Sequence, residues 1–149
     1  MQVSQMPVIK VQTNHKNVSE QFEVRLAVHM AKVMNRPESQ IFVSVDTKIR
    51  MTRGQLTDPL AVLEVTTSTC LTPELTEQYT VALCEFFEQE LQLDADSVLI
   101  NYRSISPELI GFNGHILTEN RPRITRDRFL IGVFIIAVLA FLTQFLKFI

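Results

Sequence analysis

Cysteine and histidine, two residue types that often serve as nucleophiles or metal ligands, are few in this sequence. The chain contains two cysteines, Cys70 and Cys84, and three histidines, His15, His29 and His115. The cysteines are too few for a disulfide framework and lack a Cys-x-x-Cys spacing, so we expect two ordinary buried thiols. The histidines are widely separated and have no cysteine or carboxylate at ligand spacing, so neither a metal site nor another cofactor is predicted.

Acidic and basic residues are segregated along the 149-residue chain, whose formal net charge is -2. Residues 1–120 contain 15 Asp/Glu and 9 Lys/Arg, whereas residues 121–149 contain 1 and 5. An acidic segment without a basic stripe or a Trp lacks the electrostatic attraction and stacking surfaces of nucleic-acid-binding proteins, so that function is excluded. Glu85, Glu88 and Glu90 are expected to form the solvated face of a helix.

A long apolar segment lies near the end of the chain. From Phe129 to Leu146, 18 consecutive residues carry no charge, and as a helix they would extend about 27 Å. Only Thr143 and Gln144 interrupt the segment, so it lacks the polar stripe of a typical core helix. We therefore predict one transmembrane helix at residues 129–146, in preference to a core or interfacial helix.

The flanks of this segment predict its orientation. Four arginines precede it and only Lys147 follows within the last three residues, so the positive-inside rule places the N-terminal domain in the cytosol. The first twelve residues have no apolar run of signal-peptide length, so classical secretion is not expected. The short span favours the endoplasmic reticulum or another intracellular membrane, with insertion after synthesis as in tail-anchored proteins.

Two segments with apolar residues at helical spacing predict helices in the N-terminal part. The first covers residues 17–35, with an N-cap at Asn17 or Ser19 and an end at the Arg-Pro pair that follows. The second begins after Thr72, which caps it, and has Pro73 at its first position, where a missing N–H costs nothing.

Four short, β-branched segments predict strands: residues 8–13, 41–45, 60–69 and 97–103. A weak internal repeat relates residues 36–45 to residues 93–102 at an offset of 57. Each half is then strand, helix, strand, and right-handed crossovers make the two strands of a half parallel. This predicts an α+β fold, a four-stranded sheet with two helices on one face.

The opposite face of this sheet is expected to need cover. Residues 60–63 and 98–100 are apolar at adjacent positions, which is typical of strands that are buried on both faces. We therefore expect other subunits to cover the second face of the sheet.

Several short motifs together resemble the macrophage migration inhibitory factor (MIF) family of the tautomerase superfamily. They are Met6-Pro7 at the start of the first strand, Thr13-Asn14 at its end, Pro37, Pro59, Ile100-Asn101-Tyr102 and Gly111-Phe112-Asn113. The resemblance implies a repeated β-α-β subunit that assembles as a homotrimer, with active sites between neighbouring subunits. Together with the apolar segment described above, the resemblance predicts an N-terminal extension (1–6), a MIF-like tautomerase domain (7–118), a basic juxtamembrane linker (119–128), the transmembrane helix (129–146) and a short tail (147–149).

The resemblance also implies that Pro7 is the catalytic base. In the family, the secondary amine of an N-terminal proline moves a proton α to a carbonyl, as in phenylpyruvate or dopachrome tautomerisation. An α-amino group titrates at about 7.7–8.0, close enough to neutrality for this task. Within the chain, however, the Pro7 nitrogen is a tertiary amide with no N–H and no free lone pair. Initiation at Met6, or removal of the first six residues, would free it, whereas initiation at Met1 would leave it blocked.

The other pocket positions implied by the resemblance depart in part from the family pattern. Arg36 stands in place of a lysine, Leu99 of a tyrosine and Ser68 of an isoleucine, while Asn101 is retained. Arg36 could bind a substrate carboxylate through two hydrogen bonds, whereas Leu99 and Ser68 change the pocket wall. The family's redox-active Cys-x-x-Cys corresponds to residues 60–63, which contain no cysteine and exclude that chemistry.

Each implied site residue also has a purely structural interpretation. Pro7 could only begin a strand, Arg36 could only complement the end of a helix, and Asn101 could only hydrogen-bond at a strand edge. Two functions therefore remain. One is a membrane-anchored tautomerase that acts on small keto acids through Pro7. The other is a catalytically silent, trimeric interaction or signalling module at a membrane surface.

Overall fold

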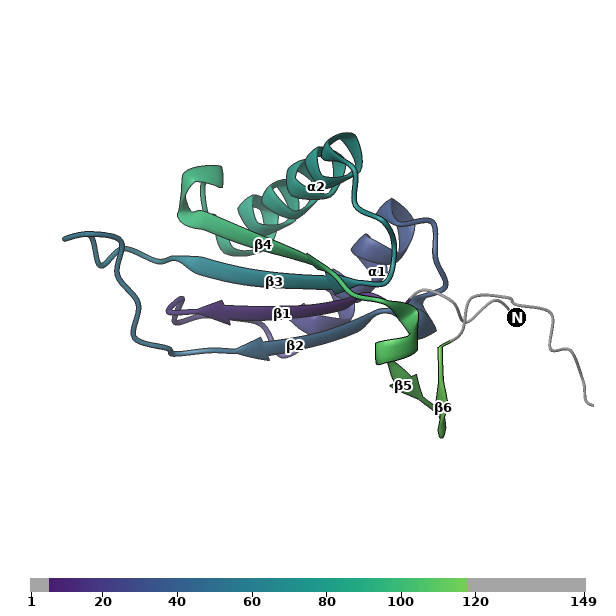
Figure 1. Cartoon of the computed structure of the whole chain (residues 1–149). Coiled ribbons are helices and arrows are strands. Elements are labelled where there is room, and N and C mark those ends of the chain that lie inside the picture. The colour runs from purple at the N-terminus through teal and green to yellow at the C-terminus, as the bar shows by residue number, and fades with distance from the viewer. Residues whose placement is uncertain (1–5, 118–149) are drawn as a thin grey trace, which may run out of the picture. The chain divides into compact units, whose positions relative to one another are not determined.

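The computed structural model describes residues 6–117, which form a four-stranded sheet, two α-helices and a small two-stranded sheet (Figure 1). The predicted basic linker, transmembrane helix and tail lie outside the described residues. Among residues 6–117, no helix is both long and apolar enough to cross a bilayer.

The main sheet consists of β1 (Val8–Thr13), β2 (Phe42–Asp46), β3 (Ala61–Thr67) and β4 (Val98–Ser104), in the order β2-β1-β3-β4. β1 is parallel to β2 and β3 is parallel to β4, while the central pair β1 and β3 is antiparallel. The two strand–helix–strand halves therefore meet at the middle of the sheet, as the internal repeat predicts. Each observed strand lies within two residues of its predicted bounds at either end.

The second helix is the one that the sequence predicts more accurately. α2 covers Pro73–Leu91, and the hydroxyl of Thr72 accepts a hydrogen bond from the backbone N–H of Leu75 (3.3 Å). Because proline at the first helical position has no N–H to leave unpaired, the sequence is well suited to begin a helix here. Gln92 ends α2 in a left-handed conformation (φ 55°).

The first helix differs from its prediction at the N-terminus. α1 covers Phe22–Val33, so it begins five residues after Asn17, and no side chain caps it. Ser19 instead accepts a hydrogen bond from the N–H of Gln21 in the preceding turn (3.2 Å), so the predicted cap is wrong. The left-handed Asn35 (φ 50°) completes the turn that follows the helix, two residues before Pro37.

One hydrophobic core lies between the two helices and the sheet. Phe22 of α1 is fully buried and contacts two aromatic rings of α2, with centroid distances of 5.4 Å to Phe86 and 5.5 Å to Phe87. The strands contribute alternate residues that are fully buried, Ile9 and Val11 from β1 and Leu63 and Val65 from β3. Both helices therefore pack on the same face of the sheet.

The opposite face is open in the single chain, and its middle is polar. The strand register places Lys10 of β1 between Ser44 of β2 and Glu64 of β3, and Glu64 beside Asn101 of β4. Lys10 also lies 3.8 Å from the carboxylate of Asp46. The expectation of an apolar second face is therefore wrong for this central row.

Large apolar side chains on the open face lie nearer its two ends. Val8 and Phe42 are each 43% exposed at one end, and Leu99 is 60% exposed at the other. Adjacent apolar residues in residues 60–63 misled the prediction, because Ala61 and Leu63 point into the core and only Val62 points the other way. Covering this face would therefore require a partner with both apolar and charged groups.

Shorter elements connect and extend this framework. Three 3-10 helices, η1 (Glu38–Gln40), η2 (Ala95–Ser97) and η3 (Pro107–Leu109), precede β2, β4 and the hairpin. The hairpin consists of β5 (Gly111–Phe112) and β6 (His115–Ile116), which the strand prediction does not include. Phe112 stands edge-on to Phe42 of β2, with a centroid distance of 5.8 Å.

Candidate functional site

Pro7 lies immediately before β1, the strand that runs between β2 and β3. Its side chain is fully buried, and its carbonyl accepts a hydrogen bond from the backbone N–H of Phe42 (3.0 Å). Met6, which precedes it, is only 3% exposed. In the chain that begins at Met1, the Pro7 nitrogen is an amide inside the protein and cannot accept a proton from a substrate.

Ser68 lies at the same end of the sheet as Pro7. The antiparallel register pairs Val8 with Thr66 near the end of β3, so the residues that follow Thr66 run past the start of β1. Ser68 is half-buried there, and the nearby Ser104 donates a hydrogen bond to the carbonyl of Thr69 (3.0 Å). The structure therefore brings the ends of β3 and β4 to the beginning of β1.

Phe42 and Phe112 form an aromatic pair beside the Pro7 backbone, and neither was a predicted site residue. Their signals were present in the sequence, since Phe42 lies in the predicted strand at residues 41–45 and Phe112 belongs to a family motif. The two residues lie 70 positions apart, so only the folded chain shows that they meet. The pair provides an apolar rim of the kind that favours a substrate with an apolar or aromatic part.

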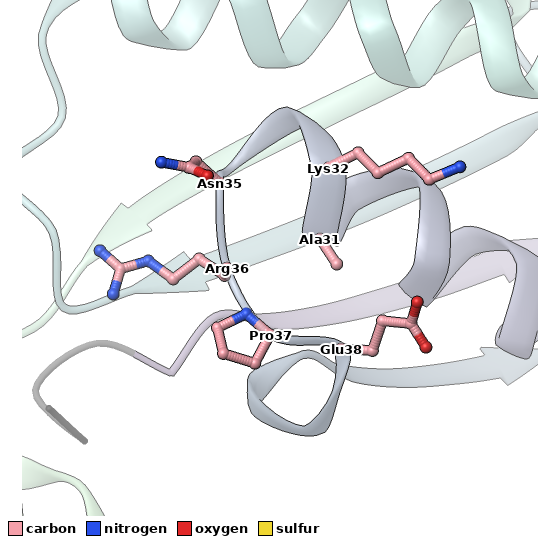
Figure 2. A pocket seen from close by; sticks show the side chains of 6 residues that line it. All are labelled: Ala31, Lys32, Asn35, Arg36, Pro37 and Glu38. Atoms are coloured by element: carbon pink, nitrogen blue, oxygen red, sulfur yellow. The ribbon is translucent and has the colours of Figure 1, made fainter. Parts of the chain in front are cut away.

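Arg36 lies where α1 turns toward β2, at an open hollow of about 560 Å³ (Figure 2). Its backbone N–H donates to the carbonyl of Ala31 (2.8 Å), which fixes the turn after the helix. Lys32 lies on the other side of the hollow, and the two cationic side chains point in opposite directions (Figure 2). Burial raises the pKa of Tyr79 in α2, and the positive charge of Arg36 partly opposes this shift.

Leu99 and Asn101 do not converge with Pro7 inside one chain. Leu99 pairs with Val62 near the start of β3, whereas Val8 pairs with Thr66 near its end. The four-residue offset from Val62 to Thr66 corresponds to roughly 13 Å along β3, and β4 lies two strand spacings, roughly 10 Å, from β1. Asn101 pairs with Glu64, so its offset along β3 is two residues shorter. A site that contains all five predicted residues would need residues from more than one subunit.

Neither the cysteines nor the histidines belong to a metal cluster among the described residues. Cys70 is exposed, contrary to the prediction of a buried thiol, because it lies in the connection between β3 and α2. Cys84 is half-buried, and burial raises the pKa of its thiol. The ring of His29 donates a hydrogen bond from Nε2 to the carbonyl of Ala82 (3.0 Å). Across residues 6–117, no three His, Cys, Asp or Glu side chains are grouped closely enough to hold a metal ion.

Glu90 differs from the predicted solvated face of α2. Arg25 of α1 donates two hydrogen bonds to its carboxylate, from Nε (2.8 Å) and from a terminal nitrogen (2.5 Å). Glu85 and Glu88 are exposed as expected. This bidentate ion pair links α1 to α2, so we assign it to the packing of the helices.

Two strand–helix–strand repeats in one sheet, with Pro7 directly before β1, are the features of a tautomerase-type fold. Residues 6–118 match the profile of the family described as macrophage migration inhibitory factor (MIF). The chain therefore belongs to the MIF family. This confirms the family resemblance that the sequence motifs indicate.

Proteins of known sequence extend this comparison. The chain is 79% identical over 146 residues to MIF-like protein mif-3 of Caenorhabditis elegans, covering 97% of this chain and all of the relative. It is 33% identical to MIF-like protein mif-2 of the same organism, covering 76% of this chain and 97% of the relative. D-dopachrome decarboxylase of Mus musculus is 25% identical, with 76% and 98% covered. The alignment with mif-3 therefore includes most of the residues after 118, whereas the other two match a length close to that of the MIF domain.

Solved structures agree on the fold. The MIF homologue of Prochlorococcus marinus superimposes with a TM-score of 0.69 at 24% identity, covering 74% of this chain and 99% of the homologue. MIF of Trichinella spiralis gives a TM-score of 0.68 at 18% identity, with 73% and 98% covered. At these identities the solved structures establish the shared fold.

Proposed function

We propose that this chain is a membrane-anchored keto–enol tautomerase that becomes active when Pro7 is its N-terminal residue. The observation that carries the proposal is the position of Pro7 at the start of β1, where β2 and β3 hold the strand on both sides. The strand pairing would fix the orientation of an amine at this position. The aromatic pair beside it suits small keto acids that carry an aromatic ring, such as phenylpyruvate.

The chemistry requires the neutral form of a free Pro7 amine. The neutral amine takes a proton from the carbon next to the substrate carbonyl, which leaves an enolate and a protonated amine. The enolate oxygen then takes up one proton from water, and the protonated amine returns its proton to water, so the amine is neutral again and no net proton is consumed. Arg36 would bind the substrate carboxylate, and Asn101 would donate a hydrogen bond to the carbonyl oxygen. Leu99 and Ser68 would form the wall of the pocket.

Assembly as a homotrimer would complete this site. Leu99 and Asn101 lie on the open face of the sheet, remote from Pro7 of the same chain. A neighbouring subunit packed on that face would bring its own Leu99 and Asn101 toward Pro7. The mixture of apolar ends and a charged middle on this face suits contact with another subunit more than contact with water alone.

The activity is tested by comparing two forms of the detergent-solubilised chain in phenylpyruvate enolisation. One form is initiated at Met6 so that removal of the methionine exposes Pro7, and the other retains Met1. We expect turnover only in the first form, and we expect Pro7→Gly in that form to reduce turnover at least about a hundredfold, the scale of a lost general base, without changing the circular dichroism spectrum. Equal turnover in Pro7→Gly would show that another group is the base.

The membrane anchor is proposed from residues 129–146, which carry no charge. The alignment with mif-3 supports a shared C-terminal region, since it reaches well beyond the MIF domain. The basic flank favours a cytosolic domain at the endoplasmic reticulum or another intracellular membrane. Flotation with phosphatidylcholine vesicles tests this: the full chain should float and resist carbonate extraction, and a chain that ends at residue 128 should not. Flotation of both chains would remove residues 129–146 as the anchor.

A second function, a catalytically silent trimeric module at a membrane surface, is favoured by the burial of Met6 and Pro7 in the continuous chain. The replacements at Arg36, Leu99 and Ser68 point the same way. Intact-mass measurement of the protein from its own cells separates the two functions. A mass that includes Met1 supports the silent module, and a mass that begins at Pro7 supports the enzyme.

A further inference from the structure

We infer that folding locks the bond between Met6 and Pro7, so that whether Pro7 becomes a free amine is decided before the domain folds. A chain that folds with Met6 in place then cannot be activated by later trimming. The inference concerns regulation of the proposed Pro7 site, so its consequence for activity rests on the proposed function. The lock itself is a property of the fold and can be measured without any activity.

The first argument is burial on both sides of the bond. Met6 is 3% exposed, and the side chain of Pro7 is fully buried. A peptidase must draw the residues on either side of a peptide bond into its own cleft, in an extended conformation. Neither residue can enter such a cleft while both remain packed in the domain.

The second argument is the place of Pro7 in the sheet. Its carbonyl accepts the hydrogen bond from Phe42 of β2, and Val8, the next residue, pairs with Phe42 on one side and Thr66 on the other. Releasing Pro7 therefore means detaching the beginning of a strand with neighbours on both sides. Openings of this kind have free energies near that of global unfolding, unlike the fraying of an exposed terminus.

The consequence is two forms of the protein that do not interconvert after folding. Hydrolysis of the bond would consume one water, giving Met6 a carboxylate and Pro7 a secondary amine. Before folding this reaction is open to the enzymes that process nascent chains. After folding, trimming from the Met1 end would stop at or before Met6. Initiation at Met1 or at Met6 would then fix the fraction of molecules with a free Pro7.

The test is digestion of the detergent-solubilised, Met1-containing chain with a broad-specificity aminopeptidase and an aminopeptidase that cleaves X–Pro bonds, followed by intact-mass measurement. A synthetic peptide of residues 1–16 is the unfolded control. The same chain with Ala-Pro added before Met1 is the folded control, because it presents an X–Pro bond outside the domain. Circular dichroism before digestion confirms that both proteins are folded.

We expect both controls to be cleaved at their X–Pro bonds, while the folded chain releases a Pro7 terminus at least about a hundredfold more slowly than the peptide, since cleavage follows the rare open state. Release of the Pro7 terminus from the folded chain within about threefold of the peptide rate would overturn the lock. Enolisation is measured separately on the chain initiated at Met6. Failure of that assay would count against the proposed function and leave the mass result on the lock unaffected.

Discussion

At the scale of single residues, Met6 is a buried side chain that joins the described part of the N-terminal extension to the folded domain. It is 3% exposed, so truncation to alanine removes buried methylene and sulfur contacts and leaves a cavity. We expect Met6→Ala to lower the free energy of unfolding of the Met1-containing chain by about 2–3 kcal/mol. Met6→Leu, which nearly conserves the volume, should cost less than about 1.5 kcal/mol. Urea denaturation measures both values, and a loss below about 0.5 kcal/mol in Met6→Ala would show that the side chain is not packed.

The site residues differ in how far the sequence could predict them. Pro7 directly precedes one predicted strand and Ser68 lies near the end of another, and their place at one end of the sheet also requires the antiparallel register of β1 and β3. The wide separation of Asn101 from Pro7 depends on register across three strands, which periodicity alone does not supply. The burial of Pro7 depends on the packing of the residue before it, and the contact of Phe42 with a phenylalanine 70 positions away depends on the whole fold.

At the scale of elements, the end of α2 offers a test of backbone strain. Gln92 adopts φ 55°, which side chains with a Cβ disfavour, while its N–H donates to the carbonyl of Glu88 (3.0 Å). Gln92→Gly should therefore raise the free energy of unfolding by about 0.5–1 kcal/mol. Glu85→Gly, in the exposed middle of the same helix, is the matched control and should lower it by about 1 kcal/mol. Thermal or urea unfolding compares them, and a loss of stability in Gln92→Gly would contradict the assigned conformation.

The contact between α2 and β4 predicts how the domain responds to alkaline pH. The hydroxyls of Tyr102 and Thr80 are hydrogen-bonded (2.9 Å). Burial raises the pKa of Tyr102 above its ordinary value of 10.0, and this hydrogen bond partly opposes the shift. Burial likewise raises the pKa of Cys84.

A raised pKa means that the folded state keeps a proton that the unfolded state loses. The stability from Tyr102 is therefore complete below its ordinary pKa of 10.0 and is lost as pH rises through the raised value. The free energy of unfolding should fall between about pH 8 and about pH 11, and it should fall less steeply in Tyr102→Phe with Cys84→Ala. Urea unfolding across this range gives both slopes. Identical slopes in the two proteins would rule out these groups as the source.

The sequence predicts the bounds of the four strands of the main sheet and the start of α2 closely, but it does not predict where α1 begins. α2 has a capping threonine, a proline at its first position and a long apolar stripe, so local signals and packing agree. At the start of α1 the segment from Asn17 contains good capping residues, but the first fully buried side chain is Phe22, and packing of that ring decides where the helix starts. The polar middle row of the open sheet face was not predicted, because two adjacent apolar residues in a strand do not show which of them points to that face.

At the scale of the whole molecule, the two faces of the main sheet differ, because the helices cover one face and leave the other exposed. The helices cover one face of the sheet and bury its apolar side chains in a single core. The other face presents Lys10, Glu64 and Asn101 in its middle row and Leu99 toward one end. A partner on that face must pair the charges as well as cover the apolar ends, and identical subunits arranged head-to-tail in a closed ring can do this at every interface.

A homotrimer formed through this face predicts a specific effect of charge at Leu99. We expect the chain that ends at residue 128 to be trimeric in sedimentation velocity, and Leu99→Glu to shift it to monomers because a carboxylate would be desolvated in the interface. Val24→Glu is the matched control, since Val24 on α1 is 64% exposed and Leu99 is 60% exposed, so neither change disturbs the core of a single chain. Unchanged circular dichroism in both variants would confirm that the fold is intact. A monomeric parent chain would contradict assembly through the domain, and an intact trimer in Leu99→Glu would place the subunit contact away from Leu99. Either result would leave Leu99 and Asn101 without a route to the Pro7 of a neighbour.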